Sequence, residues 1–221
     1  MDAVQRHRWD LAIAAENAGW EFGDHAAYAR HEHGMRHGQI TYARLMGLFE
    51  AYGNAGALER FHAYDCPVFD LGGRSVVDVA GGPCSLLLRC SRIGRALVVD
   101  PGAFPEWVVH RYDEHGIYVA PIPAEDYAYP DGTVDEVWMY NALAHVCDPA
   151  SVLRAAMKNC RVLRIVEGIE CGTDVQHPHS LTASGLADVL GPGGRVVAPL
   201  DPPPAPRGRV FCGVFLSAVN P

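Results

Sequence analysis

The stretch VVDVAGGPCSLLLRC, residues 76–90, decides the fold. It is an apolar run that contains one acid, Asp78, and ends in the small residues AGG (80–82). Small residues at the tip of a strand let the backbone approach a ligand there. We therefore expect a buried strand over SVVDVA (75–80), a ligand-binding turn, and a helix over SLLLRCSRI (85–93).

Strand and helix patterns alternate from residue 74 onward. Further strands are expected at RALVVD (95–100), IYVAPIP (117–123), VDEVWMYNAL (134–143), RVLRIVEGIE (161–170), GRVVAPL (194–200) and RVFCGVFLSAV (209–219). Further helices are expected at PEWVVHRYDEHG (105–116), DPASVLRAAMKNC (148–160) and SLTASGLADVLG (180–191). This alternation predicts an α/β fold, a Rossmann-like three-layer sandwich around a seven-stranded, mostly parallel sheet. The last two strands have no helix between them, so they should form a C-terminal antiparallel hairpin.

The first 65 residues show helical spacing of apolar residues and no strand pattern. AVQRHRWDLAIAAENAGW (3–20) should form a helix that stops near Gly19, and GQITYARLMGLFEAYG (38–53) a second one that ends at Gly53. We therefore divide the chain into a helical N-terminal cap, residues 1–72, and an α/β domain, residues 73–221.

Composition excludes several classes of protein. The chain has 221 residues and a formal net charge of −8, which disfavours tight binding to polymeric nucleic acid. Seven cysteines without a C-x-x-C pair indicate reduced thiols rather than a disulfide frame or a zinc site. No segment approaches the roughly 18 apolar residues that span a bilayer. We expect a cytoplasmic protein that does not enter a membrane.

The acid Asp100 lies at the tip of the next expected strand, 22 residues after Asp78. At this spacing an acid is placed to accept hydrogen bonds from both hydroxyls of a ribose. A dinucleotide-binding turn would carry glycine where this chain has Ala80 and Cys84. Asp78 would repel a diphosphate and suits an ammonium group instead. The residues therefore favour a ligand with a ribose and a positively charged amine, but no phosphate.

In these blocks, residues 74–219 resemble class I S-adenosylmethionine-dependent methyltransferases. VVDVAGGPCS resembles their motif I, and LVVDPG resembles their second strand with its ribose-binding acid. PIPAEDYAYPDGTVDEVWMYNALAHVCDP is similar to the family's stretch from the adenine-binding acid through the fourth strand. The terminal hairpin is the family's addition to a Rossmann sheet. GPGG (191–194) resembles a turn before the family's fifth strand, but we place it before the sixth because RVLRIVEGIE fills the fifth position.

The resemblance implies S-adenosylmethionine as cofactor and assigns its contacts. Asp78 would orient the methionyl amine, Asp100 would bind the ribose hydroxyls, and Asp126 or its neighbour Glu125 would bind the adenine amino group. The full set of implied cofactor-binding residues is Asp78, Ala80, Gly81, Gly82, Asp100, Pro101, Glu125, Asp126, Asn141 and Ala142. The chain departs from the family pattern at Ala80 and at Cys84, whose side chain could narrow the pocket.

A hydroxyl acceptor needs a base, and histidine suits neutral pH. His145, four residues after Asn141 and just past the fourth strand, is the candidate catalytic residue; the alternative is a histidine that only lines the loop. His177 and His179 follow the fifth strand, where loops often carry function, but a turn fixed by Pro178 explains them as well.

Residues in the N-terminal cap offer weaker candidates. His33 and His37 are four apart and could share one helical face, but no third metal ligand is evident, so we predict no metal site. Trp9, Trp20, Tyr28 and Tyr42 could line the acceptor pocket or belong to the core. Arg30, Arg36 or Arg44 could reach the methionyl carboxylate.

These observations together predict an S-adenosylmethionine-dependent methyltransferase that modifies an O or N atom of a small-molecule acceptor. Alternatives are a cofactor-binding protein of the same fold without turnover, a methyltransferase of a nucleotide or modified base, and a nicotinamide-dependent oxidoreductase. A homodimer is compatible with the sequence.

Overall fold

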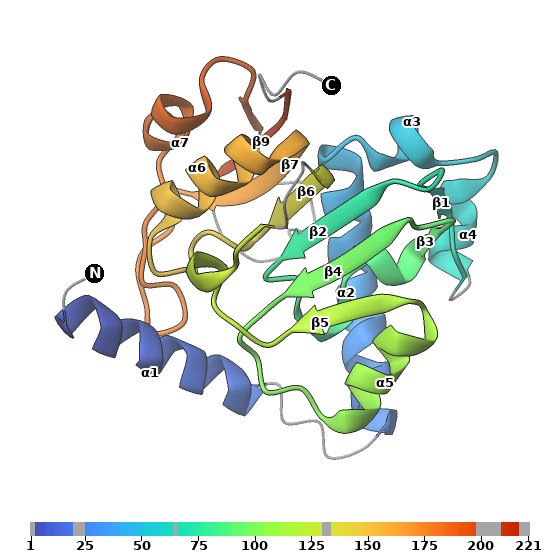
Figure 1. Cartoon of the computed structure of the whole chain (residues 1–221), viewed down its shortest axis with the longest axis horizontal. Helices are drawn as coiled ribbons and strands as arrows, with labels where there is room; N and C mark the ends of the chain where they lie inside the picture. The colour runs from blue at the N-terminus through green and yellow to red at the C-terminus, as the bar shows by residue number, and fades with distance from the viewer. Residues whose placement is uncertain (1–2, 20–24, 64–65, 130–133, 198–208, 217–221) are drawn as a thin grey trace.

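The strand that precedes the glycine turn, β2 (Ser75–Val79), lies near the middle of a seven-stranded sheet (Figure 1). The structure is a computed structural model that describes residues 3–19, 25–63, 66–129, 134–197 and 209–216. The strand order is β5-β4-β2-β6-β7-β9-β8. The other strands of the sheet are β4 (Arg95–Val99), β5 (Ile117–Ala120), β6 (Val134–Tyr140), β7 (Cys160–Ile169), β8 (Arg195–Val197) and β9 (Arg209–Leu216).

Strands β2, β4, β5, β6 and β7 run parallel, whereas β9 pairs antiparallel with both β7 and β8. This confirms the predicted α/β class and the C-terminal hairpin. The turn at 191–194 precedes β8, the sixth strand of this sheet along the chain, as predicted. From β2 the chain builds outward through β4 to β5 and then returns to the other side of β2 with β6. In open α/β sheets, ligands bind at this reversal of strand order, beyond the carboxyl ends of the strands.

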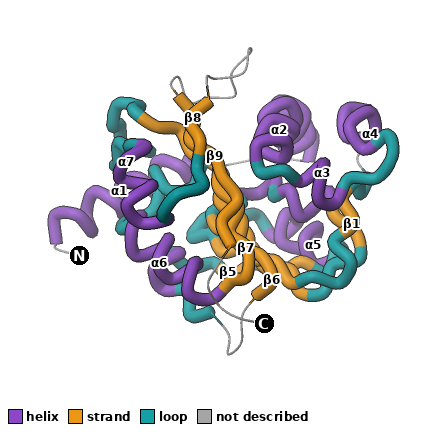
Figure 2. The backbone as a smooth tube through the Cα atoms, turned by 90° about the horizontal axis from the view of Figure 1, so that it is seen from above, coloured by secondary structure: helices purple, strands orange, loops and turns teal. Residues whose placement is uncertain are grey.

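Helices cover both faces of the sheet, which makes three layers (Figure 2). One face carries α6 (Pro149–Asn159) and α7 (Ala183–Leu190), and α1 (Ala3–Gly19) lies on the same side of the molecule. The other face carries α2 (His25–Leu45), α3 (Leu48–Tyr52), α4 (Ala57–Ala63) and α5 (Glu106–Glu114). Each face has its own buried apolar cluster, because side chains alternate along every central strand. None of the helices in the described ranges is long and apolar enough to cross a membrane.

Helix α6 begins where its sequence predicts. Asp148 is the N-cap, its side chain accepts a hydrogen bond from the Ser151 amide, and Pro149 holds the first helical position. Such a cap stabilises a helix by about 1 kcal/mol. The helix therefore starts immediately beyond the loop that follows β6, which fixes the position of that loop at the carboxyl edge of the sheet.

The helix predicted over SLLLRCSRI is wrong. The segment forms a short 3-10 turn, η2 (Leu86–Arg89), which follows η1 (Gly82–Cys84), and then a two-residue strand, β3 (Cys90–Ser91). That strand pairs in parallel with β1 (Phe69–Asp70). Every residue from Pro83 to Cys90 is buried, so the segment has no exposed face, and tertiary hydrogen bonds replace the helical ones.

The second N-terminal helix is longer and ends earlier than the pattern over 38–53 predicts. It begins at His25, upstream of that pattern, and ends at Leu45. The break falls at Gly47, whose φ of 70° lies in the left-handed region that favours glycine. Because the chain turns there, α3 lies beside the sheet instead of continuing the axis of α2.

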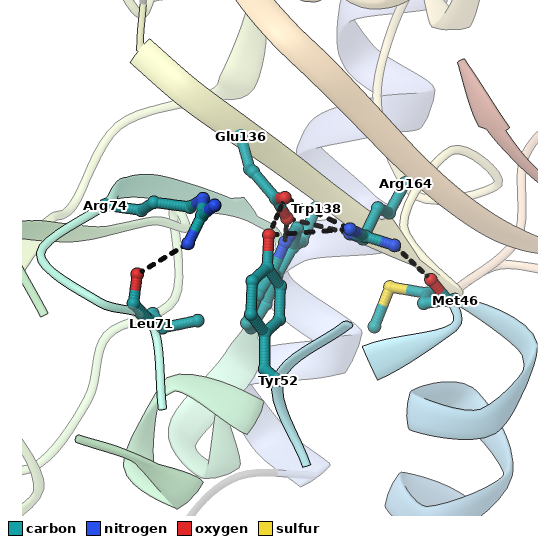
Figure 3. Close-up of polar contacts among 7 residues, drawn as sticks. All are labelled: Met46, Tyr52, Leu71, Arg74, Glu136, Trp138 and Arg164. Atoms are coloured by element: carbon teal, nitrogen blue, oxygen red, sulfur yellow. Dashed lines mark hydrogen bonds and ion pairs between the residues drawn. The ribbon is translucent and has the colours of Figure 1, made fainter. Parts of the chain in front are cut away.

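A buried ion pair fixes α3 against the middle of the sheet (Figure 3). Glu136 on β6 accepts two hydrogen bonds from Arg164 on β7, at 2.8 Å to Nε and 3.1 Å to Nη2. The Tyr52 hydroxyl and the Trp138 indole also donate to this carboxylate. Arg164 Nη1 donates to the carbonyl of Met46 at the end of α2. The cluster thus joins two strands to the segment that connects α2 and α3.

Replacing Glu136 by Gln should destabilise the protein by about 3–5 kcal/mol, because Arg164 would remain buried without a counter-ion. Glu170→Gln is the matched control, since the Arg209–Glu170 pair is exposed and should contribute at most about 1 kcal/mol. Chemical denaturation of both variants measures the difference. Equal losses would contradict this role for the buried pair.

Candidate functional site

The turn after β2 is held to the tip of β4. The Gly82 amide donates to Asp100 Oδ2 at 3.0 Å, and the Gly102 amide donates to Oδ1 of the same carboxylate at 2.8 Å. Ala80 has φ 55° and Gly82 has φ 61°, both in the left-handed region. Glycine reaches this conformation without cost, whereas alanine does not. Ala80, which stands where the family pattern has glycine, is therefore strained.

Asp78 is completely buried beneath this turn. Its Oδ2 accepts hydrogen bonds from the Ser85 hydroxyl at 2.5 Å and from the Tyr140 hydroxyl at 2.6 Å. Its Oδ1 has no partner among the described residues. Burial raises the pKa of Asp78 to about 7, the two hydrogen bonds oppose that rise, and the charge of Asp100 adds to it. The carboxyl group therefore has an unmet capacity for a hydrogen-bond donor or a positive charge.

Helix α2 covers the turn from the side of the sheet that also carries α5. The side-chain amide of Gln39 donates to the carbonyl of Cys84, and Gln39 Oε1 has no partner within the described ranges. The ring of Tyr42, one turn further along α2, lies 5.5 Å from the ring of Tyr140. Cys84 itself is buried in η1, at the third glycine position of the family motif.

Helix α1 lies across the carboxyl edge of the sheet. Trp9 Nε1 donates to the carbonyl of His145, beyond β6, at 3.1 Å. Asn17 Oδ1 accepts from the amide of Ala103, beyond β4, at 3.0 Å. Figure 1 shows the arrowheads of β2, β4 and β5 pointing toward the side of the molecule on which α1 lies. The helix therefore bridges the loops on both sides of β2.

Two histidines from distant loops meet at this edge. The rings of His145 and His177 are 4.5 Å apart, and His177 Nδ1 lies 2.9 Å from Asp174 Oδ1. His145 Nε2 lies 3.5 Å from Asn141 Nδ2. Burial, and secondarily the neighbouring His177, lower the pKa of His145 to about 4. The imidazole of His145 is therefore neutral at pH 7 and able to accept a proton.

The remaining residues implied by the resemblance differ in their exposure and in the hydrogen bonds that they make. Glu125 Oε1 accepts from the amides of Cys147 and Asp148, at 2.5 and 2.9 Å, and so holds the loop after β6. Its neighbour Asp126 is exposed. Pro101 and Asn141 are half-buried, whereas Ala142 is fully buried and its amide donates to Glu167.

Several weaker candidates lie elsewhere or outside the description. Arg30 and Arg44 are exposed, and Arg36 donates to the carbonyl of His62 in α4. His179 is half-buried in the loop after β7. Trp20 and the side chains of Tyr28, His33 and His37 lie outside the described residues. Within the described part of the chain, no group of three or more His, Cys, Asp or Glu side chains could hold a metal ion.

Sequence reasoning missed the partners of the site. Tyr140 was not among the candidate residues, and Ser85 was placed in a helix, yet both donate to Asp78. Glu167 carried a usable signal, because it is an acid near the end of an apolar strand, as Asp78 is. Gln39 carried none, since its partner Cys84 is 45 residues away.

Comparisons with known proteins agree with this architecture. No protein-family model and no curated protein matches the sequence. The plantazolicin methyltransferase BpumL, in complex with a monoazolic desmethylPZN analog and SAH, is similar over 96% of this chain and 97% of that chain, with a TM-score of 0.53 and 11% identity. The N-methyltransferase NodS from Bradyrhizobium japonicum WM9 is similar over 82% of this chain and 95% of that chain, with a TM-score of 0.53 and 10% identity.

The chain has the class I methyltransferase fold. The resemblance seen in the sequence is thus confirmed at the level of the fold. Similarity to the [4+2]-cyclase SpnF covers 57% of this chain and 53% of that chain, so the chain spans about half the length of that protein. Within the methyltransferase fold, the loops after β2, β4, β6 and β7 form the edge at which the candidate residues gather.

The geometry of the turn predicts how two substitutions change the stability of the protein. A Cβ on Gly81 would lie 2.7 Å from Asp78 Oδ2, so Gly81→Ala should cost about 1–3 kcal/mol of stability. Ala80→Gly relieves a left-handed alanine, worth about 1–2 kcal/mol, against about 0.5–1 kcal/mol of added chain entropy, and should be neutral or stabilising. Thermal unfolding compares the two variants; a stabilising Gly81→Ala or a strongly destabilising Ala80→Gly would refute the geometry.

Proposed function

We propose that this protein is an S-adenosylmethionine-dependent methyltransferase that transfers a methyl group to an O or N atom of a small-molecule acceptor. One observation carries the proposal. The carboxylates of Asp78 and Asp100 lie at the tips of the neighbouring strands β2 and β4, and the Gly82 turn links them. In this fold that position suits a ligand with a ribose at one end and an ammonium group at the other.

The residues present fit this cofactor better than a dinucleotide. Asp78 offers a buried oxygen, Oδ1, without a partner among the described residues, which a positive charge would satisfy. A Cβ on Gly81 would lie against the same carboxyl group, so the turn packs closely on Asp78. The space beneath the turn is thus taken by a carboxyl group, where a dinucleotide-binding turn would hold a phosphate. A diphosphate placed there would meet two carboxylates.

Each part of the cofactor has a proposed set of contacts in the chain. Asp100 would accept hydrogen bonds from the ribose hydroxyls. Asp126, which is exposed, suits the adenine amino group better than Glu125, whose Oε1 already accepts from two amides. Asn141 and Ala142 would lie beside the methionyl part, and the N-terminal helices would cap the site.

Bound S-adenosylmethionine supplies a methyl carbon activated by its sulfonium, so proximity and alignment do most of the remaining work, worth about 7–11 kcal/mol. Helix α1, which spans from the His145 loop to the Ala103 loop, would exclude water from the edge of the sheet. His145 would accept a proton at Nε2 from a hydroxyl acceptor, and His177, oriented by Asp174, stands next to it for onward transfer.

The low pKa of His145 makes it a weak base at pH 7. That observation supports a second candidate, a cofactor-binding protein of the same fold without turnover. Transfer of a radiolabelled methyl group to any acceptor in a mixed panel of alcohols, amines and nucleosides supports the enzyme. Cofactor binding without product from any acceptor supports the second candidate.

S-adenosylhomocysteine should stabilise the protein, by about 2.7 kcal/mol at 100 times its dissociation constant, whereas NAD should not. Asp100→Ala should weaken S-adenosylhomocysteine binding by about 10–100-fold, because charge-assisted hydrogen bonds to the ribose are lost. Asp113→Ala, on the exposed side of α5, is the control and should bind normally. Isothermal titration calorimetry gives both affinities; an unchanged affinity in Asp100→Ala would refute the assigned pocket.

His145→Ala should leave the affinity for S-adenosylhomocysteine within about twofold and slow methyl transfer by about 10²–10⁴-fold. Because the His145 pKa is lowered to about 4, the base stays deprotonated in mildly acidic solution, and the wild-type rate should fall only below about pH 5. The pH–rate profile measures this fall in rate on the acid side. An acid limb near pH 6.5, or a fully active His145→Ala variant, would exclude His145 as the base; His179→Ala serves as the control.

A further inference from the structure

Glu167 lies near the carboxyl end of β7, in the strand next to β6. Its side chain is 1% exposed. Oε1 accepts hydrogen bonds from the amides of Ala142 and Leu143, at 2.9 and 3.1 Å. The carboxyl group is therefore fixed against the loop that follows β6, the same loop that carries His145.

The second oxygen of Glu167, Oε2, is buried and has no hydrogen-bond partner among the residues that the structure describes. A buried polar atom without a partner destabilises the protein, and does so more when it is charged. Burial raises the pKa of Glu167 to about 8. Neither protonation state resolves the problem, since a neutral carboxyl would bury a hydroxyl without an acceptor. Such an atom indicates a ligand that donates to it.

The strand order places Glu167 on the acceptor side of the proposed cofactor site. Asp100 follows β4, Asp78 lies on β2, Asn141 follows β6, and Glu167 lies on β7, in that spatial order across the sheet. Neighbouring strands are about 4.8 Å apart, so β7 is two strand spacings from β2, on the side away from Asp100. A nucleoside held by Asp100 and Asp78 therefore has its reactive end directed toward β6 and β7.

The Tyr42 side chain of α2 lies near this carboxyl group. Glu167 is close enough to Tyr42 that its charge, after burial, raises the pKa of the Tyr42 hydroxyl. The Tyr42 ring in turn lies 5.5 Å from the Tyr140 ring. Tyr42 and Glu167 are therefore neighbours, although they lie on α2 and β7.

We propose that Oε2 of Glu167 binds a protonated amine of the methyl acceptor. The inference rests on the proposed function and narrows it, since the acceptor is then a molecule that carries an ammonium group. The amine would donate to Oε2 while Ala142 and Leu143 hold Oε1, so the carboxylate is ionised and fully hydrogen-bonded when the acceptor is bound. The same chemistry is present in the methionyl ammonium of the cofactor, and the experiment separates the two sources.

Glu167→Gln removes the charge and keeps an oxygen for the two loop amides, so the fold should be preserved. Glu170→Gln, three residues further along and exposed, makes the same substitution and is the matched control. Calorimetry with wild type and both variants measures the binding of S-adenosylhomocysteine and of 5′-methylthioadenosine, which lacks the amino-acid part. Methylamine, propylamine and benzylamine, each beside the alcohol of the same carbon skeleton, are then titrated into the proteins saturated with S-adenosylhomocysteine.

We expect both nucleosides to bind Glu167→Gln within about twofold of wild type. At least one amine should bind wild type and Glu170→Gln in preference to its alcohol, and should bind Glu167→Gln at least about tenfold more weakly. The proposal is overturned if amines bind no better than alcohols, or if Glu167→Gln retains the preference. It is also overturned if Glu167→Gln loses S-adenosylhomocysteine but not 5′-methylthioadenosine, because the carboxylate then serves the cofactor.

Failure of the proposed function gives a different result. Wild type would then bind neither nucleoside, and the amine titrations would be made on the protein without nucleoside. A Glu167-dependent preference for amines there supports an ammonium site, and equal binding of amines and alcohols excludes one.

Discussion

The buried carboxylate of Asp78 organises the carboxyl edge of the sheet, and the rest of the candidate site depends on it. It accepts from Ser85 and Tyr140, and Ser85 Oγ in turn caps η2 by accepting from the Leu87 amide. The Tyr140 hydroxyl accepts from the Leu86 amide. One acid thus orders both the glycine turn and the 3-10 segment, which follow it along the chain. Asp78 Oδ2 accepts both of these side-chain hydrogen bonds, whereas Oδ1 has no partner among the described residues. The same carboxylate therefore orders the turn and offers an oxygen to a cation.

Helices from the N-terminal part of the chain complete this edge. Helix α2 contributes Gln39 and Tyr42 above the turn, and α1 joins the loop after β6 to the loop after β4 through Trp9 and Asn17. The edge is therefore built from residues that are more than 100 positions apart. Asp78 and Asp100 at this edge suit a positively charged nucleoside. Beyond them, toward β7, lie the neutral imidazole of His145 and the buried carboxyl group of Glu167, which would suit a cationic methyl acceptor.

The sequence predicted most of the sheet because local pattern and tertiary packing agree there. Central strands such as β2 and β6 are buried on both faces and are mostly apolar in sequence, and α6 carries its own N-cap at Asp148. The helix over SLLLRCSRI was wrong because its leucines are all buried and its first amides bond to Tyr112 and Tyr140, which lie in distant elements. Local propensity contains no information about such partners.

The candidate site was predictable in part for the same reason. Asp78 and Asp100 stand at strand ends, as expected, whereas the ribose site that their spacing predicts stays a prediction. The meeting of His145 with His177 and the cover that Gln39 provides depend on long-range packing, which no local spacing reveals. Glu167 could have been found by asking why an apolar strand tolerates an acid.

The most direct test is a crystal structure of the protein grown with S-adenosylhomocysteine. Density should lie across the carboxyl ends of β4, β2 and β6, with the ribose hydroxyls on Asp100, the ammonium group toward Asp78 and the sulfur directed toward β7. Density at another place on the molecule, or none at saturating ligand, would contradict the central claim that these two carboxylates hold a phosphate-free, cationic nucleoside.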